Sequence, residues 1–141
     1  ESFTQNYQVS ARSSFRNWPN FEVGYNYTVN NYNNGGLEQT FFTERPFVEL
    51  DVNFLKYFSL SADWNFYNYT NKAETVNNEY SFLNGTLYFQ QEDSAWEFSL
   101  QGTNLLNTQF TNNDSFNDEF NTTNQYFVLP RIVMLVVKYN L

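Results

Sequence analysis

Three carboxylates stand within six residues near the C-terminal end of the chain. Asp114, Asp118 and Glu119 lie in the stretch 112–119, among asparagine and serine side chains. Oxygen ligands of this kind suit Ca²⁺, but the spacing is not that of an EF-hand loop, and the bidentate glutamate that closes such a loop is missing. We therefore predict a solvated polar loop with no bound metal, in which these three residues are the only candidate ligands.

Histidine and cysteine are both absent from the sequence. Ser-His-Asp and Cys-His catalysis, HExxH zinc sites and most proton shuttles each need one of these residues. This chain alone therefore cannot build them, and disulfide bonds are excluded for the same reason. We expect no enzyme activity and no cofactor.

The net charge separates the chain from proteins that bind nucleic acid. It carries 7 basic and 15 acidic residues, for a formal charge of −8. Nucleic-acid-binding proteins neutralise phosphates with clustered lysines and arginines, and this sequence has no such cluster. We expect no nucleic acid among the partners.

The elements that position these side chains are β-strands, and the clearest of them ends the chain. The segment Gln125–Leu141 (QYFVLPRIVMLVVKYNL) is rich in β-branched and apolar residues. Because side chains alternate along a strand, one face carries Val133, Leu135, Val137, Tyr139 and Leu141. An edge strand of this kind promotes aggregation in a soluble protein. A closed barrel in lipid needs one, because every backbone group must be paired and the outer surface must be apolar.

The composition agrees with a barrel in lipid. Aromatic residues make up 21% of the chain, yet the mean hydropathy is −0.60. A soluble core could not easily bury 16 Phe, 11 Tyr and 3 Trp among so many asparagines. Membrane barrels place aromatic side chains in girdles at both interfaces and keep polar side chains in the lumen. No apolar run approaches the roughly 20 residues of a membrane helix.

Alternation of apolar and polar residues predicts about seven strands, whereas a helical period is absent. We expect the strands at about 4–15, 21–31, 40–54, 58–70, 80–90, 96–106 and 125–141. The terminal strand should pair with the sixth. Pro46 cannot donate to a ladder, so a bulge or a late start of regular pairing is expected in the third strand.

The connections between these strands alternate between short and long. Long polar loops are expected at 32–39, 71–79 and 107–124. Membrane barrels have short periplasmic turns and long extracellular loops, and about ten tilted residues cross their apolar band of about 25 Å. The sequence therefore predicts an all-β, antiparallel transmembrane barrel in the lipid of the outer membrane. Its C-terminus would be periplasmic and the three long loops extracellular.

Polar and aromatic side chains in the strands fit the same interpretation. Five carboxylates would face the lumen, namely Glu22, Glu49, Asp51, Asp63 and Glu97. They are candidates for steering a cationic or metal-bound ligand, but a lumen that is polar by default explains them more simply. The aromatic residues near strand ends are most simply girdle residues, namely Trp18, Tyr57, Trp64 and Trp96.

The expected number of strands indicates whether this chain could form a whole barrel. Bacterial single-chain barrels have an even number of strands, eight at minimum. Seven strands imply either missing N-terminal sequence or one overlooked strand of a small barrel. No signal peptide opens the chain, and Glu1-Ser2-Phe3 has the character of mid-protein sequence. We interpret residues 1–141 as the C-terminal part of a larger barrel, with no plug domain in this chain.

The C-terminal half carries the residues of a family resemblance. Trp96-Glu97-Phe98-Ser99-Leu100, then Asn104-Leu105-Leu106-Asn107, then Pro130-Arg131 precede the terminal apolar stretch. This order resembles the end of a TonB-dependent outer-membrane receptor, and more narrowly the Bacteroidota-type barrels. Leu141 departs from the pattern, because the residue that ends the barrel-assembly signal is commonly aromatic; Tyr139 partly supplies that character.

The resemblance implies a barrel of 22 strands, occluded by a plug, that imports a ligand with energy relayed by the TonB complex. The barrel assembly machinery would recognise the terminal strand, whereas TonB and a surface lipoprotein would act through parts outside this chain. The alternative is a barrel without transport that holds other surface proteins through its loops. A soluble β-sandwich or lectin is disfavoured, because its exposed edges and aromatic faces would aggregate. These residues do not identify a substrate.

Overall fold

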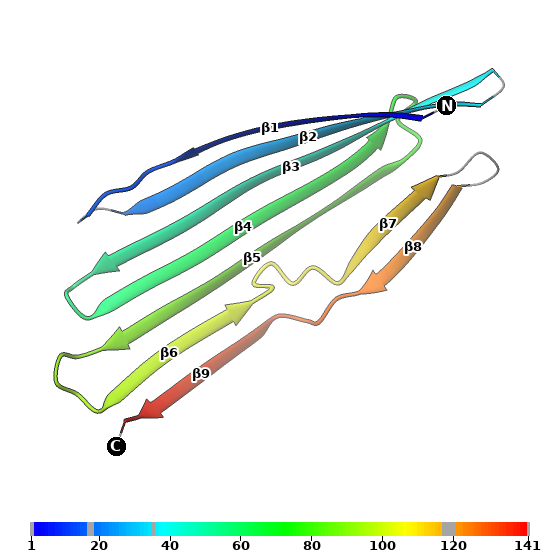
Figure 1. Ribbon diagram of the computed structural model, residues 1–141. Helices are drawn as coiled ribbons and strands as arrows, with labels where there is room; N and C mark the ends of the chain where they lie inside the picture. The colour runs from blue at the N-terminus through cyan, green and yellow to red at the C-terminus, as the bar shows by residue number, and fades with distance from the viewer. Residues whose placement is uncertain (1, 17–18, 35, 117–120, 141) are drawn as a thin grey trace.

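The computed structural model describes residues 2–16, 19–34, 36–116 and 121–140 (Figure 1). These residues form strands and no helix, so the predicted all-β class is confirmed. The strands are β1 (Ser2–Arg12), β2 (Asn20–Asn34), β3 (Leu37–Phe54), β4 (Phe58–Asn71), β5 (Asn77–Gln90), β6 (Trp96–Thr103), β7 (Phe110–Phe116), β8 (Asn121–Phe127) and β9 (Ile132–Tyr139).

Seven of the strands build one antiparallel sheet in the order β1-β2-β3-β4-β5-β6-β9. Strands β7 and β8 form a separate hairpin between β6 and β9. Figure 1 shows the main sheet as an open single layer, with β1 at one edge and β9 at the other. The predicted pairing of the terminal strand with the sixth is confirmed.

The register gives the main sheet two chemically different faces. Val23 on β2 lies opposite Val48 on β3, which lies opposite Trp64 on β4 and then Leu83 on β5. The neighbouring residue on each of these strands points to the other side and is mostly polar. We call the first side the apolar face and the second the polar face. Because a one-residue slip would exchange the two faces, the alternating pattern fixes the register of each pair.

A conventional hydrophobic core is missing from the described part of the chain. Phe41 and Tyr69 are its only buried apolar side chains, and they stack at 5.6 Å on the polar face. The apolar face stays open, with Leu100, Leu135 and Val133 each more than 40% exposed. A single sheet needs a second layer or a nonpolar solvent against such a face.

The prediction of a long loop at 32–39 is wrong. Strand β2 continues to Asn34 and β3 starts at Leu37, so this region is a tight hairpin. Gly36, with φ +107°, takes a backbone conformation that other residues rarely adopt. Polar side chains suggested a loop here, but the backbone N–H and C=O groups of a hairpin hydrogen-bond to each other whatever the side chains are.

The other connections also differ from expectation. Strand β5 begins at Asn77, which shortens the loop expected at 71–79, and the loop expected at 107–124 contains β7 and part of β8. The link 13–19 between β1 and β2 is longer than the turn between β2 and β3. Alternation of short and long irregular connections is therefore not observed; two of the three long polar segments are largely strand instead.

Three strand boundaries are corrected. The strand expected over 125–141 starts at Ile132, and Gln125–Phe127 belong to β8 instead. The strand expected over 96–106 ends at Thr103, because Asn104 has a left-handed backbone with φ +51°. The first strand ends at Arg12 rather than residue 15.

The prediction of a bulge or a late start of pairing at Pro46 is also wrong. Pairing of β3 with β2 runs through Pro46 opposite Tyr25. Pairing with β4 skips only Arg45 and Pro46, and it resumes in the same register, with Glu44 opposite Asn68 and Phe47 opposite Asn65. The missing N–H interrupts one ladder locally without inserting a residue.

Candidate functional site

The apolar face has an aliphatic centre bordered by two groups of aromatic rings. The centre consists of Val48, Leu50, Val52, Leu60, Ala62, Leu83, Leu87, Leu100, Val133 and Leu135. At the end of the sheet that holds the β3–β4 and β5–β6 turns, Phe58 lies 4.8 Å from Phe89, and Trp96 lies 4.7 Å from Tyr139, between ring centroids. Aromatic side chains therefore close off the aliphatic centre at this end.

The opposite border is formed by rings of β1 to β4. Tyr27 stacks on Phe42 at 6.2 Å, and Trp64 stacks on Phe66 at 6.2 Å. On β4 the same face becomes polar one step beyond Phe66, where Asn68 lies opposite Glu44 on β3 and Glu79 on β5. Glu44 lies in the same cross-strand row as Tyr27, so polar and aromatic side chains meet at this border. The apolar face is thus a band of limited height with aromatic borders. Of the predicted girdle residues, Trp64 and Trp96 lie in these borders, whereas Trp18 lies outside the described residues.

The polar face carries a row of ionisable and amide groups across five strands. Arg12, Glu22, Glu49, Asp63 and Asn84 lie directly opposite one another from β1 to β5. The Nε of Arg12 donates to Glu22 at 2.6 Å, and the Nδ2 of Asn84 donates to Asp63 at 2.9 Å. The structure thus brings together carboxylates that the sequence alone left on separate strands.

Two shallow hollows lie along this row. One of about 270 Å³ is lined in part by Arg12, Glu22 and Glu49, and one of about 300 Å³ by Glu49, Asp51 and Asp63. Only Glu22 of these carboxylates forms an ion pair within the described residues. The described residues hold no group of carboxylates close enough to bind a metal ion. Because Glu49, Asp51 and Asp63 have no ion pair within the described residues, the row gives this part of the polar face a net negative charge.

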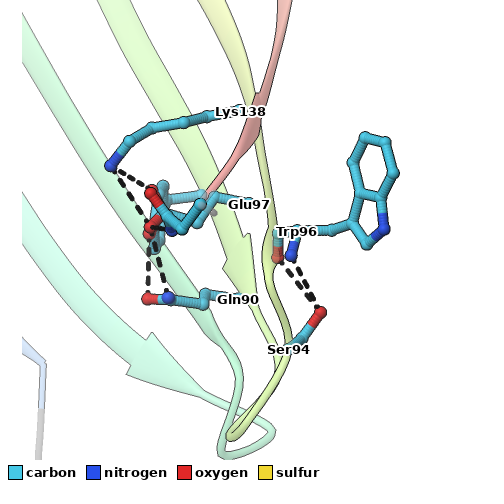
Figure 2. A network of polar contacts seen from close by, with 7 residues as sticks. Gln90, Ser94, Trp96, Glu97 and Lys138 are labelled. Atoms are coloured by element: carbon cyan, nitrogen blue, oxygen red, sulfur yellow. Dashed lines mark hydrogen bonds and ion pairs between the residues drawn. The ribbon is translucent and has the colours of Figure 1, made fainter.

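The fifth predicted carboxylate, Glu97, fastens the terminal strand (Figure 2). Lys138 on β9 donates to it at 3.3 Å, Asn140 at 2.6 Å, and Gln90 on β5 at 3.3 Å. Figure 2 shows these groups on one side of the sheet, while Trp96 points to the other. Glu97 thus links three strands on the polar face and has no free side for a ligand.

The two motifs that carry the family resemblance are joined to each other by hydrogen bonds. Asn104 is only 2% exposed, and its Nδ2 donates to the carbonyls of Thr108 and Leu129 at 2.8 and 2.9 Å. Asn107 accepts from the backbone N–H of Arg131 at 3.3 Å, and Arg131 donates back to the carbonyl of Leu105 at 3.4 Å. This cluster, which we call the asparagine latch, joins the end of β6 to the start of β9.

The remaining predicted site residues are the loop carboxylates and the apolar residues of the terminal strand. Asp118 and Glu119 lie outside the described residues, and of Asp114 only the backbone, in β7, is described. Of the residues predicted to form a barrel-assembly signal, namely Val133, Leu135, Val137, Tyr139 and Leu141, the first four share the apolar face, opposite Gly102, Leu100, Phe98 and Trp96. Leu141 lies outside the described residues.

Sequence reasoning missed two contacts. Lys56 and Glu92 form an ion pair of 2.7 Å between the β3–β4 and β5–β6 turns. The Glu92 carboxylate, and then the Tyr57 hydroxyl, raise the pKa of the Lys56 ammonium above its ordinary value. Phe47 covers Gly24 so closely that a Cβ there would lie 2.3 Å from its ring. Neither contact can be found without the register, because the partners lie far apart in sequence.

Among the described residues, no helix is long and apolar enough to cross a membrane. No protein-family model, curated protein or solved structure matches the chain.

Proposed function

We propose that this chain is part of the wall of a transmembrane β-barrel in the outer membrane. The observation that carries the proposal is the apolar face, an aliphatic band with aromatic borders on an uncovered single sheet. In water such a face would cost free energy over its whole area. Against lipid it is favourable, and the rings at both borders suit the two interfaces.

The height of the band supports the proposal. On β4 it runs from Phe58 to Phe66, after which Asn68 begins the polar part. Eight steps of roughly 3.3 Å give about 26 Å along the strand, and a tilt near 40° reduces this to about 20 Å across the membrane. The apolar band of a barrel is about 25 Å tall. The height of about 20 Å is shorter than this by about two tilted residues per strand.

The directions of the two edge strands support a larger barrel. Strands β1 and β9 stand at positions one and seven of an antiparallel series, so they run the same way. Joining them directly would create a parallel seam. An all-antiparallel closure, as in bacterial single-chain barrels, takes an odd number of further strands between them. We therefore assign this chain to a larger barrel, to which strands outside residues 1–141 contribute.

For the whole protein we propose TonB-dependent import of a ligand. This step rests on the resemblance of Asn104–Asn107 and Pro130–Arg131 to the end of such receptors. The asparagine latch gives those residues a physical role, because it sets where the last strand enters the sheet. In this proposal the strands form the wall, the polar face lines the lumen, and the barrel assembly machinery recognises β9.

Membrane insertion can be tested by purification and gel electrophoresis. The proposal expects the protein to require detergent or vesicles and, when folded, to migrate differently in unheated and heated gel samples. A chain that is soluble and monomeric without detergent would contradict the wall assignment.

Transport needs a separate test on the full-length gene product. The proposal expects a plug domain and a segment that binds the periplasmic domain of TonB in a pull-down experiment. If the full product has neither and instead retains surface proteins, the alternative of a non-transporting partner barrel is correct.

A further inference from the structure

Glu44 is an unneutralised carboxylate on the apolar face, at the border that holds Tyr27. The Oε1 of Glu44 accepts from the Tyr25 hydroxyl at 2.8 Å, and its Oε2 accepts from the Nδ2 of Asn68 at 3.1 Å. Both donors are neutral, and the ion pairs among the described residues do not include Glu44. Arg45, the next residue, lies over the ring of Tyr67 on the polar face. The charge of Glu44 therefore lacks a counter-charge.

The surroundings of Glu44 are rich in acceptors and poor in donors. The Oδ1 of Asn68 is buried and has no hydrogen-bond partner in the described part of the chain. Asn68 lies opposite Glu79 on β5, which adds a second carboxylate to the same cross-strand row. A carboxylate has room for about four hydrogen bonds, of which Glu44 uses two. A group with several donors and a positive charge would complement this row.

A hollow next to Glu44 extends toward the aliphatic band. It measures about 400 Å³ and is lined by Tyr7, Gln8, Val9, Tyr25, Tyr27 and Glu44. Tyr7 and Tyr25 each lie 6.4 Å from Tyr27, between ring centroids, so the hollow has aromatic walls. Val9 and Tyr25 lie one step closer to the aliphatic band than Tyr27 and Glu44. The hollow is thus charged at its polar end and apolar at the other.

We propose that Glu44 binds the primary ammonium group of an amine-headed lipid whose acyl chain lies along Tyr7, Val9 and Tyr25. A primary ammonium supplies three donors and one positive charge, and the tyrosine faces add cation–π attraction. The apolar end of the hollow continues into the band that the proposed function places against lipid, and this inference rests on that function. A free amine would leave the apolar walls uncovered, so a lipid fits better.

The test uses the protein in vesicles that contain phosphatidylethanolamine, its N-methylated forms or phosphatidylcholine, with bound lipid detected by native mass spectrometry. Retention should decrease as methyl groups replace N–H donors, with about a tenfold difference between the first and last lipid. Equal retention, or retention that rises with methylation, would overturn the proposal. This series needs no variant and does not depend on the folding of one.

Two variants with the same change locate the site. Glu44→Gln should reduce phosphatidylethanolamine retention to the level of phosphatidylcholine. Glu49→Gln, on the polar face of the same strand, should leave it unchanged. If Glu44→Gln retains the lipid as the parent does, the site is wrong. Binding of dissolved ethanolamine as tight as that of the lipid would show that the acyl chain contributes nothing and would overturn the lipid assignment.

The two proposals fail in distinguishable ways. A chain that does not enter vesicles contradicts the membrane wall, and the lipid site with it. A full-length protein that enters vesicles, forms a heat-modifiable barrel and shows no headgroup preference contradicts only the lipid site.

Discussion

At the scale of single residues, the buried Asn104 stabilises a part of the fold that the strand ladders do not reach. Asn104 is among the few buried side chains of the described residues, and it is polar. Its amide and carbonyl satisfy backbone groups at Thr108 and Leu129, which no strand ladder reaches. Its positive φ is a conformation that asparagine tolerates better than most residues. The abundance of asparagine thus has a structural basis at this position.

Replacing Asn104 by alanine should destabilise the protein by about 3 kcal/mol, because buried backbone groups would lose their partners and alanine disfavours positive φ. Urea unfolding followed by tryptophan fluorescence measures the loss. Asn77→Ala is the control, since Asn77 is exposed at the start of β5, and its effect should stay within about 0.5 kcal/mol. Equal effects of the two substitutions would contradict the latch.

The Lys56–Glu92 pair should show a defined pH dependence. The folded pKa of Lys56 is raised, so its stabilising contribution is present in full below the ordinary value of 10.5 and is lost as pH rises through the folded pKa. A double-mutant cycle with Lys56→Met and Glu92→Gln measures the coupling. We expect a small coupling at about pH 8 and none at about pH 12. A coupling that persists at the higher pH would refute the assignment.

At the scale of elements, the β7–β8 hairpin is joined to the main sheet near its base. The base is closed by a hydrogen bond of 3.0 Å from the N–H of Val128 to the carbonyl of Gln109. Thr108, next to this base, donates its hydroxyl to the carbonyl of Ser81 on β5. Further along β7, the Nδ2 of Asn112 donates to the Oδ1 of Asn78 on β5 at 2.8 Å. Figure 1 shows the hairpin apart from the main sheet, beyond the end of β6. Its removal should therefore leave the wall intact.

Deletion of residues 110–127, with a short glycine-serine turn in their place, tests this independence. The asparagine latch would remain, because Asn104, Asn107 and Arg131 lie outside the deleted segment. The variant should keep the heat-modifiable migration expected of the parent and unfold at nearly the same urea concentration. Loss of assembly would mean that the hairpin is part of the wall.

At the scale of the whole molecule, the sheet has a preferred solvent on each side. The polar face carries the carboxylate row, while the apolar face carries the aliphatic band and its aromatic borders. This separation extends over β1 to β6, whereas β9 also carries Ile132, Met134 and Val136 on the polar face. Water suits the polar side, and the apolar side needs either a second layer or the lipid that we propose.

A pair of neighbouring lysine substitutions measures that asymmetry. Leu87→Lys places a charge at the centre of the apolar face and should destabilise the protein in vesicles by about 2–4 kcal/mol. Thr86→Lys places the same charge on the polar face, where the neighbours are Ser61 and Gln101, and should have little effect. Unfolding in urea from vesicles gives both values. Similar losses for the two variants would exclude lipid on the apolar side.

Much of the architecture was determined by the sequence, because alternation acts locally. The period of two residues was enough to predict the all-β class, the two faces and most strand positions. The pairing of the terminal strand with the sixth was also predicted, although not which residues pair. The polar or apolar character of each face was predictable for the same reason, because alternation assigns every side chain of a strand to one of the two faces.

Only the tertiary structure decided what depends on long-range pairing. The hairpins at 32–39 and 107–124 consist of polar residues, whose strand conformation comes from a partner strand and not from their own side chains. The carboxylate row, the latch between Asn104 and Arg131, and the setting of Glu44 each join segments that are distant in sequence. Local alternation fixes which way a side chain points, whereas register fixes what it meets.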